Sequence, residues 1–507
     1  MTVDGVNLAA PGVVDGVVDV LYSPSMDEIE MSGEFWDRTE MHRSRGALRR
    51  DEEDGKIRLG VETWIKRDAT NRVIRSEGQI AIEHGGGPAD HISDFKPRTV
   101  YGISDDGVEL SLFRAQGGGD GVSLFRDYGQ DYGVGLVVIG AHLEGHGNCI
   151  GVRFRFKYFP FAHLVDEGCD LKSTGGGGHL AIVDDSNDCW IELRFNSGIA
   201  VEDVGSIALY PCITFARTIL GVDLEPVEIQ VRVNEHHWLD WVSGHRHRAQ
   251  KGRLRPLADR KDITVDHLGA WVDLCASTDG LVTAVADFDG SAAIEAQTMV
   301  LCSIAEGVHR KLFRQSVEYP ELTKAQLRAV RRTMREAGME ALRGYGIDDQ
   351  ERFNRLNGPL SMIGDAKYKV RMSELQEVSD RYFSEITSQF DDWPTAMQKA
   401  RNDLIHSLDI ESDTEPTPEQ RETARRHLEN LMLAATSSAI WVLKGVYFNA
   451  IGLSPEVILN RLGSRDAYWF AVANIADFLS GHPCAAASSV DEAADADDRP
   501  SEAGNLG

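Results

Sequence analysis

The chain has 507 residues, and its 53 lysine and arginine side chains against 80 aspartate and glutamate side chains give a formal net charge of -27. This length exceeds the size at which one hydrophobic core usually stops growing, so we expect more than one domain. The negative charge argues against a protein that coats nucleic acid over its whole surface, because that mode depends on lysine and arginine neutralising phosphates. Any RNA site must be local.

The N-terminal segment, residues 1–25, is weakly patterned and is expected to be flexible. It carries Asp4 and Asp15 where a secretory signal needs cations followed by an apolar run. The longest apolar stretch, around residues 431–443, is short of the ~20 residues that a membrane helix needs. The seven cysteines are dispersed, as is usual for reduced thiols, and lack the paired spacing of a zinc site. We therefore expect a cytoplasmic protein without a membrane partner, metal or cofactor.

Residues 26–290 carry the pattern of β-strands. Apolar and polar side chains alternate over residues 57–63, 108–112, 150–156 and 227–233, and stretches rich in glycine and aspartate separate them. A period of two residues is typical of half-buried strands. The sequence predicts an antiparallel sandwich or barrel, with a helical tail after about Leu268.

After Asp289 and Gly290 the apolar period becomes helical. We therefore predict an α+β protein with a boundary near residue 290, a helical bundle over residues 291–483 and a disordered acidic tail over residues 484–507. Apolar stripes at positions 301, 305, 308 and 312 and at positions 375, 378, 382 and 386 mark two of the helices. The residues 417–420, Thr-Pro-Glu-Gln, resemble a capping box with proline at the first helical position, and we interpret them as the start of the last helix.

The most informative stretch is residues 401–406, Arg-Asn-Asp-Leu-Ile-His. The preceding Asp392-Trp393-Pro394 predicts a helix start, and apolar residues at 397, 400, 404 and 408 predict its buried stripe. On this helix Asn402 and His406 share a face, so the amide can orient the imidazole. Arg401 points about 140° away from His406. It must reach round the helix or meet a histidine of a second subunit, so we expect a homodimer.

Arginine and histidine together suit cleavage of an RNA phosphodiester without a metal. The guanidinium stays charged and binds phosphate, and the imidazole titrates near neutral pH and can move protons. The spacing alone proves little, because elsewhere in the chain an arginine also precedes a histidine by five to seven residues. The other arginine and histidine pairs are Arg232 with His237, Arg260 with His267, and Arg421 with His427. The structural alternative is a cation at a helix end beside a histidine of the core.

This arrangement resembles the HEPN family of ribonucleases, small helical domains that dimerise to build a shared cleft. Residues 304–310 resemble the first HEPN helix and residues 401–406 the catalytic one. The whole layout resembles the ApeA-type anti-phage proteins, in which a β-rich N-terminal domain precedes a HEPN domain. That part of the likeness rests on loose strand motifs at residues 32–36, 46–48, 57–59, 101–103, 108–112 and 139–143, and at Phe154 and Phe156. The resemblance covers roughly residues 25 to 480.

The resemblance implies a metal-independent endoribonuclease that acts in abortive infection. The N-terminal domain would sense an unknown phage trigger, and the HEPN domain would then cut host RNA, with tRNA as a candidate, while sparing DNA. Arg401, Asn402 and His406 would be the catalytic residues. The products would carry 2′,3′-cyclic phosphate and 5′-hydroxyl ends.

A basic run in the helical region is the candidate RNA track. Its members are Arg310, Lys311, Arg314, Lys324, Arg328, Arg331, Arg332, Arg335 and Arg343. We expect Arg328, Arg331, Arg332 and Arg335 to bind RNA, and the alternative is a solvated helix face whose cations favour helix formation and solubility.

Two other functions remain open at the level of sequence. One is a non-catalytic HEPN scaffold that dimerises and binds RNA or a protein, with a β-rich domain that recognises a ligand. The other is a carbohydrate-binding or protein-binding sandwich that the helices support.

The glycine run at residues 175–178 is interpreted as a turn, because it leads into a predicted strand where a phosphate loop requires a helix. The histidines at positions 236, 237, 245 and 247 are a weaker zinc candidate, since neighbours on a strand point to opposite faces.

Overall fold

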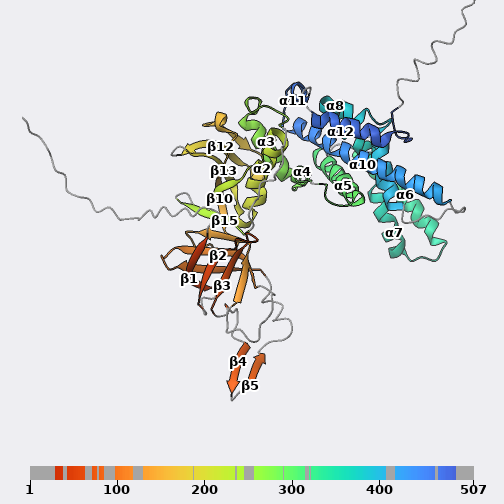
Figure 1. The fold of residues 1–507 in the computed structure, drawn as a ribbon. Coiled ribbons are helices and arrows are strands. Elements are labelled where there is room, and N and C mark those ends of the chain that lie inside the picture. The colour runs from red at the N-terminus through yellow and green to blue at the C-terminus, as the bar shows by residue number, and fades with distance from the viewer. Residues whose placement is uncertain are drawn as a thin grey trace, which may run out of the picture. The chain divides into compact units, whose positions relative to one another are not determined.

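The computed structural model describes residues 29–37, 43–62, 65, 71–76, 79–84, 97–117, 130–185, 188–233, 237–244, 256–288, 290–313, 319, 321–406, 417–462 and 466–486. The protein has an α+β fold, with strands in its N-terminal half and helices in its C-terminal half (Figure 1). The chain forms two compact units. The first contains Met1–Gly145 and Leu239–Arg246, and the second contains His146–Trp238 and His247–Gly507. The expected domain boundary near residue 290 stays a prediction.

In the first unit, six antiparallel strands close into a barrel in the order β7-β6-β1-β2-β3-β8, and β8 pairs back onto β7. The strands are β1 (Glu30–Trp36), β2 (Ser44–Arg50), β3 (Ile57–Val61), β6 (Arg98–Ser104), β7 (Glu109–Gly117) and β8 (Gln130–Val134). Phe35, Leu59, Leu112 and Tyr132 are buried in the barrel interior. The prediction of an antiparallel barrel-like domain is therefore confirmed.

Four further strands complete the first unit. β9 (Leu136–Ile139) pairs with β7 on one side and with β15 (Trp238–Ser243) on the other, and β4 (Asn71–Ser76) and β5 (Gln79–His84) form a separate hairpin.

The second unit contains an antiparallel sheet of its own. Its strands follow the order β11-β12-β13-β10-β14. They are β10 (Asn148–Phe156), β11 (Gly168–Leu171), β12 (Gly178–Asp185), β13 (Asp188–Ala200) and β14 (Pro226–Arg232). All four stretches that alternation predicted as strands overlap observed strands, namely β3, β7, β10 and β14.

Between β13 and β14 the chain forms a helical segment that the sequence did not reveal. It consists of η3 (Val201–Asp203), η4 (Gly205–Leu209), α2 (Tyr210–Phe215) and η5 (Ala216–Leu220). Every side chain from 211 to 220 is buried. A helix buried on all sides has no polar stripe, and therefore shows no amphipathic period by which it can be recognised.

The glycine run at residues 175–178 forms a turn, as predicted, and Gly178 begins β12. The backbone N–H groups just before it do bind an anionic group, which is a carboxylate of the protein itself. Lys172, Ser173 and Thr174 donate to the carboxylate of Asp273 at 2.6, 2.8 and 2.9 Å. Because Asp273 lies on α3, the contact ties this turn to a helix and leaves these donors already satisfied.

The helical region begins with α3 (Val265–Ser277), close to the predicted Leu268, and the described residues after it form nine more helices. These are α4 (Leu281–Ala286), α5 (Ile294–Leu312), α6 (Lys324–Arg343), α7 (Asp349–Ser361), α8 (Tyr368–Thr387), α9 (Trp393–His406), α10 (Pro418–Ala450), α11 (Pro455–Leu462) and α12 (Asp466–Leu479). The capping box of Thr417 and Gln420 is confirmed. Our prediction that it opens the last helix is wrong, because α11 and α12 follow.

α10 is the central helix of this region and packs against α5, α8, α9 and α12. Among the described helices it is the one long and apolar enough to cross a membrane, yet 72% of its most apolar window is buried inside the fold. Two buried hydrogen bonds fix its neighbours. The Thr436 hydroxyl lies 3.1 Å from that of Thr298 on α5, and Trp393 Nε1 of α9 donates to Ser438 Oγ at 2.8 Å.

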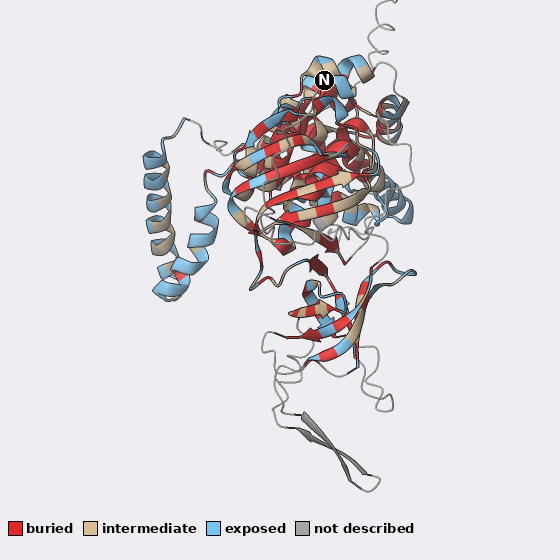
Figure 2. Ribbon diagram, turned by 90° about the vertical axis from the view of Figure 1, so that its left-hand side faces the viewer, coloured by how far each residue is buried: buried red, intermediate tan, exposed pale blue. Residues whose placement is uncertain are grey.

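α6 and α7 form a hairpin whose residues are largely exposed or half-buried (Figure 2). Along its described length α6 contains no buried residue. Gly338 packs against Leu356 and so holds the two helices together. The hairpin thus depends on contacts between its own helices.

The crossing of α8 and α10 gives a prediction about stability. A Cβ added at Gly445 would lie 2.6 Å from Ser379 Oγ and 3.0 Å from its Cα. Gly445→Ala should therefore push the helices apart and lower the free energy of unfolding by ~1–3 kcal/mol, measured by urea unfolding with circular dichroism. The control is Gly344→Ala, where the nearest atom to an added Cβ is 3.7 Å away. An equal loss in both variants would contradict this account of the crossing.

Candidate functional site

The helix that carries the predicted motif is α9, and its start follows the prediction. Asp392 Oδ1 accepts the backbone N–H of Thr395 at 3.1 Å, as an N-cap does. Met397 and Ala400 are buried, which confirms the first half of the apolar stripe. Asn402 and His406 both lie on α9, four residues apart and hence on one face. The side chains of Ile405 and His406, and all of residues 407–416, fall outside the described part of the chain.

Arg401 lies at the junction of α5, α8 and α9. Its Nη2 is 3.4 Å from Glu306 Oε2 of α5, and its guanidinium carbon is 4.7 Å from the ring centre of Tyr368 of α8. The Tyr368 ring is buried, and 35% of the Arg401 side chain is exposed. The guanidinium is thus held by a carboxylate and an aromatic face while one side of it meets solvent.

The meeting of Arg401 and Glu306 follows from how α5 and α9 attach to α10. Thr298 on α5 and Trp393 on α9 bond to Thr436 and Ser438, which are close neighbours on α10. Glu306 and Arg401 each lie eight residues beyond these anchors. Eight helical residues rise by ~12 Å, so the two side chains lie equally far along their helices from the anchors on α10.

Glu306 also binds a second arginine. Arg310 Nη2 donates to Glu306 Oε1 at 2.8 Å, so the two oxygens of one carboxylate face two guanidiniums. A third arginine, Arg371, is buried nearby and donates from Nε to the carbonyl oxygen of Ala366 at 2.8 Å. Burial lowers the pKa of Arg371, and the charge of Arg310 adds to this effect. The junction therefore gathers three arginines, with Glu306, Asp365 and Glu374 as the carboxylates that act on them.

Beside this cluster lies a buried histidine that the sequence did not single out. His309 Nε2 is 2.6 Å from Glu374 Oε2, and its ring stacks on Phe313 at 4.8 Å between centroids. Within the described residues, the buried Nδ1 finds no hydrogen-bond partner. Burial lowers the pKa of His309, although the Glu374 carboxylate acts in the opposite direction. The imidazole is therefore favoured in its neutral form.

Burial also keeps the two other polar groups beneath Arg401 neutral. It raises the pKa of the Tyr368 hydroxyl and that of the Cys302 thiol. A neutral thiol is a poor nucleophile, so neither group is suited to attack a substrate.

Of the four arginines predicted to bind RNA, two make contacts within the α6–α7 hairpin and two are exposed to solvent. Arg331 Nε donates to the carbonyl oxygen of Ile363 at 2.7 Å, and Arg335 donates to Asn357 Oδ1 at 3.1 Å. These two therefore hold the α6–α7 hairpin together. Arg328 and Arg332 are exposed on α6 and remain accessible to a ligand.

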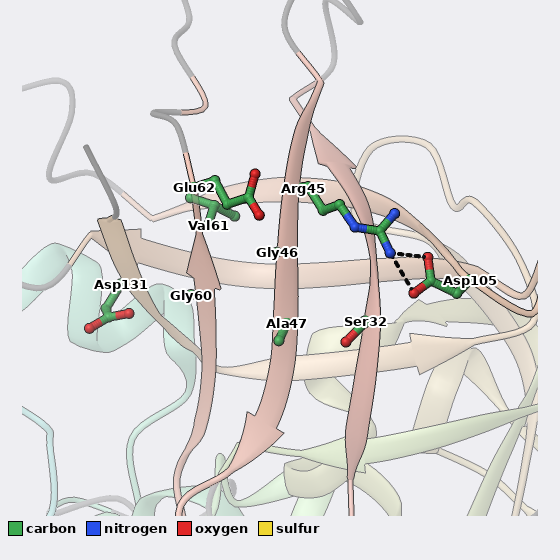
Figure 3. A pocket seen from close by; sticks show the side chains of 9 residues that line it. All are labelled: Ser32, Arg45, Gly46, Ala47, Gly60, Val61, Glu62, Asp105 and Asp131. Atoms are coloured by element: carbon green, nitrogen blue, oxygen red, sulfur yellow. Dashed lines mark hydrogen bonds and ion pairs between the residues drawn. The ribbon is translucent and has the colours of Figure 1, made fainter. Parts of the chain in front are cut away.

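A second candidate site is a shallow pocket on the outer wall of the barrel (Figure 3). Its floor is a row of small residues that pair across neighbouring strands, namely Ser32, Ala47 and Gly60. Arg45 Nη2 donates to both oxygens of Asp105, at 2.9 and 2.7 Å. Glu62 and Asp131 also line the pocket. Because its arginine is already paired with a carboxylate, the pocket suits a cationic ligand better than a phosphate.

Within the described ranges, no group of three or more His, Cys, Asp or Glu side chains is arranged to hold a metal ion. Of the four clustered histidines, His236, His245 and His247 lie outside those ranges. Compared with protein-family models, curated proteins and solved structures, the chain has no match.

The buried His309 gives a prediction about pH. Its pKa in the folded protein lies below the ordinary value of 6.5, so the unfolded chain takes up a proton more readily. The free energy of unfolding should therefore fall as the pH is lowered from about 7 to about 5. His309→Gln should make this fall shallower in urea unfolding at several pH values.

His267 and His482, whose pKa values burial also lowers, should leave part of the slope in that variant. A slope unchanged by His309→Gln would contradict the assignment.

Proposed function

We propose that the protein is a metal-independent endoribonuclease of the HEPN type, and that it acts as an anti-phage effector similar to the ApeA-type proteins. Arg401, Asn402 and His406 are its catalytic residues. The observation that carries the proposal is the placement of Arg401. Its guanidinium is half-exposed at a junction of three helices, held by Glu306 and Tyr368, on the same helix as His406.

This placement favours a functional arginine over a solvated one. An exposed arginine keeps its rotamer freedom, and fixing it costs conformational entropy. A guanidinium held beforehand binds a phosphate without that cost, which is how preorganised groups stabilise a transition state. One carboxylate cannot occupy all five N–H donors of a guanidinium, so Arg401 keeps donors for an oxyanion.

In the proposed reaction the 2′-hydroxyl of RNA attacks the adjacent phosphorus. The 2′-oxygen to phosphorus bond forms, and the phosphorus to 5′-oxygen bond breaks. One imidazole takes the 2′ proton, and an acid gives a proton to the departing 5′-oxygen. Arg401 stabilises the charge on the non-bridging oxygens. The products carry a 2′,3′-cyclic phosphate and a 5′-hydroxyl, and DNA, which lacks the nucleophile, is not cut.

Two catalytic protons have to be moved, and one chain offers one His406. A homodimer solves this, because His406 of the partner subunit can serve as the second acid or base. Asn402 shares a helix face with His406 and orients its ring. Arg328 and Arg332 on α6 are the arginines best placed to bind RNA away from the scissile bond, since both are exposed.

The physiological role in this proposal is abortive infection. The β-rich domain senses a phage trigger, and the nuclease then cuts host RNA, with tRNA as the candidate target. The pocket lined by Glu62, Asp105 and Asp131 is one surface at which a cationic trigger can bind.

A second candidate function is a non-catalytic HEPN scaffold that dimerises and binds RNA or a protein partner. The contact between Arg401 and Glu306 favours it, because a carboxylate 3.4 Å away neutralises part of the charge that catalysis needs.

The test is RNA cleavage by the purified protein in the presence of EDTA. We expect tRNA or bulk RNA to be cut to products with cyclic phosphate ends. Arg401→Ala and His406→Ala should each reduce the rate by about a hundredfold or more, the usual contribution of such groups. The matched control is Arg421→Ala with His427→Ala, which changes a similarly spaced pair on the first turns of α10 and should leave the rate unchanged.

Inhibition by EDTA that a particular metal reverses would defeat the metal-independent mechanism. If overexpression arrests growth equally with and without Arg401 and His406, the scaffold function is correct instead.

A further inference from the structure

The carboxylate of Glu306 lies between two arginines that both reach solvent. Arg310 contacts Oε1 at 2.8 Å and Arg401 contacts Oε2 at 3.4 Å. Their side chains are 52% and 35% exposed, whereas that of Glu306 is 21% exposed. The cations therefore stand further out than the anion that joins them.

Charge and hydrogen-bonding capacity at this point remain unbalanced. One carboxylate compensates one of the two exposed guanidiniums, so these three side chains together carry one positive charge, while Asp365 and Glu374 act on the buried Arg371. The two guanidiniums together have about ten N–H donors, more than the roughly four hydrogen bonds that one carboxylate can accept. A phosphodiester carries a single negative charge and four oxygens, and one such group would restore the balance.

The arginine with the longer contact to Glu306 is supported on another side. The ring of Tyr368 lies beneath Arg401 and keeps its guanidinium from folding into the protein. Arg310 is fixed by its position, since Glu306 and Arg310 are four residues apart on α5 and share a helix face. Both guanidiniums are therefore held by groups of the protein before any ligand arrives.

We propose that Arg310 binds the same RNA phosphate as Arg401, and that Glu306 is the positioning residue that holds the two guanidiniums together as a clamp. This inference rests on the proposed function and adds two residues to its site. The ligand of the clamp is a phosphodiester of RNA. Glu306 acts through the arginines and does not touch the substrate.

The neighbouring groups explain why the clamp is made of these two arginines. Arg371 is too deeply buried to reach a ligand and donates to Ala366. Glu374 lies 2.6 Å from His309 and accepts its hydrogen bond when Nε2 carries the proton. Lys311 pairs with Asp279 at 2.6 Å. Among the described cations of the junction, the two guanidiniums on Glu306 are thus the ones that combine exposure with a fixed position.

The test is a double-mutant cycle on binding of a fluorescein-labelled 2′-O-methyl RNA oligomer, which cannot be cleaved because its 2′-oxygen is blocked. Arg310→Ala and Arg401→Ala should each weaken binding by about tenfold, as expected for a charge-assisted contact near the surface. If the two arginines share one phosphate, the affinity of the double variant should fall by far less than about a hundredfold, which is the product of the two single effects.

Glu306→Ala tests the positioning role. In this background Arg310→Ala should weaken binding by less than about twofold, because the unanchored side chain no longer contributes. The matched control is Arg425→Ala, another exposed arginine with a glutamate four residues away on its helix, and it should leave binding unchanged. Circular dichroism of each variant checks that it is folded.

The inference is overturned if Arg310→Ala binds the oligomer as tightly as the unsubstituted protein does, or if the unsubstituted protein does not bind it. It is also overturned if the affinity of the double variant falls by the full product of the two single effects. Cleavage assays separate this result from the proposed function. Cleavage that depends on Arg401 but not on Arg310 removes the clamp and leaves the ribonuclease. The predicted coupling without any cleavage of natural RNA leaves the clamp and removes the ribonuclease.

Discussion

The burial of α10 is the constraint on which the helical region depends. A helix enclosed by α5, α8, α9 and α12 exposes little of its middle to water, so each neighbour must fit its surface closely. Two hydroxyl groups of α10, those of Thr436 and Ser438, find partners in Thr298 and Trp393. Each bond fixes one point of contact, of α5 and of α9, on α10. Packing of the core thereby determines which polar side chains meet at its edge.

At that edge the fold brings Arg310, Arg401 and Glu306 together in a protein with a net charge of -27. The overall charge repels nucleic acid at long range, but salt screens it beyond ~10 Å. Recognition of a phosphate is then decided by the few groups within direct reach. A carboxylate between two arginines weakens their positive electrostatic field, but it also fixes the positions of their N–H donors. Donors held in fixed positions are what stabilise a transition state.

Much of the fold was predictable because its signals are local. Alternation marks β3, β10 and β14, and Asp392 and Thr417 mark helix starts, since each depends on neighbours in the sequence. The helical segment that includes Tyr210–Phe215 was missed because residues 211–220 are all buried, which removes the amphipathic period.

Of the site, the sequence predicts the helix of Arg401 and its spacing to Asn402 and His406. It does not predict the partner of Arg401, because Glu306 lies far away in sequence on another helix, α5. It also does not show that Arg331 and Arg335 are used within their own hairpin. The one local signal for the cluster was Glu306 followed four residues later by Arg310, beside the buried stripe of α5.

The most direct test of the central claim is a crystal structure of the protein with a uridine–vanadate complex, which mimics the five-coordinate phosphorus of RNA cleavage. The account predicts vanadate oxygens within hydrogen-bonding distance of Arg401, with the His406 imidazole directed at an apical oxygen. Vanadate bound elsewhere, or a His406 ring enclosed by apolar side chains away from Arg401, would contradict it.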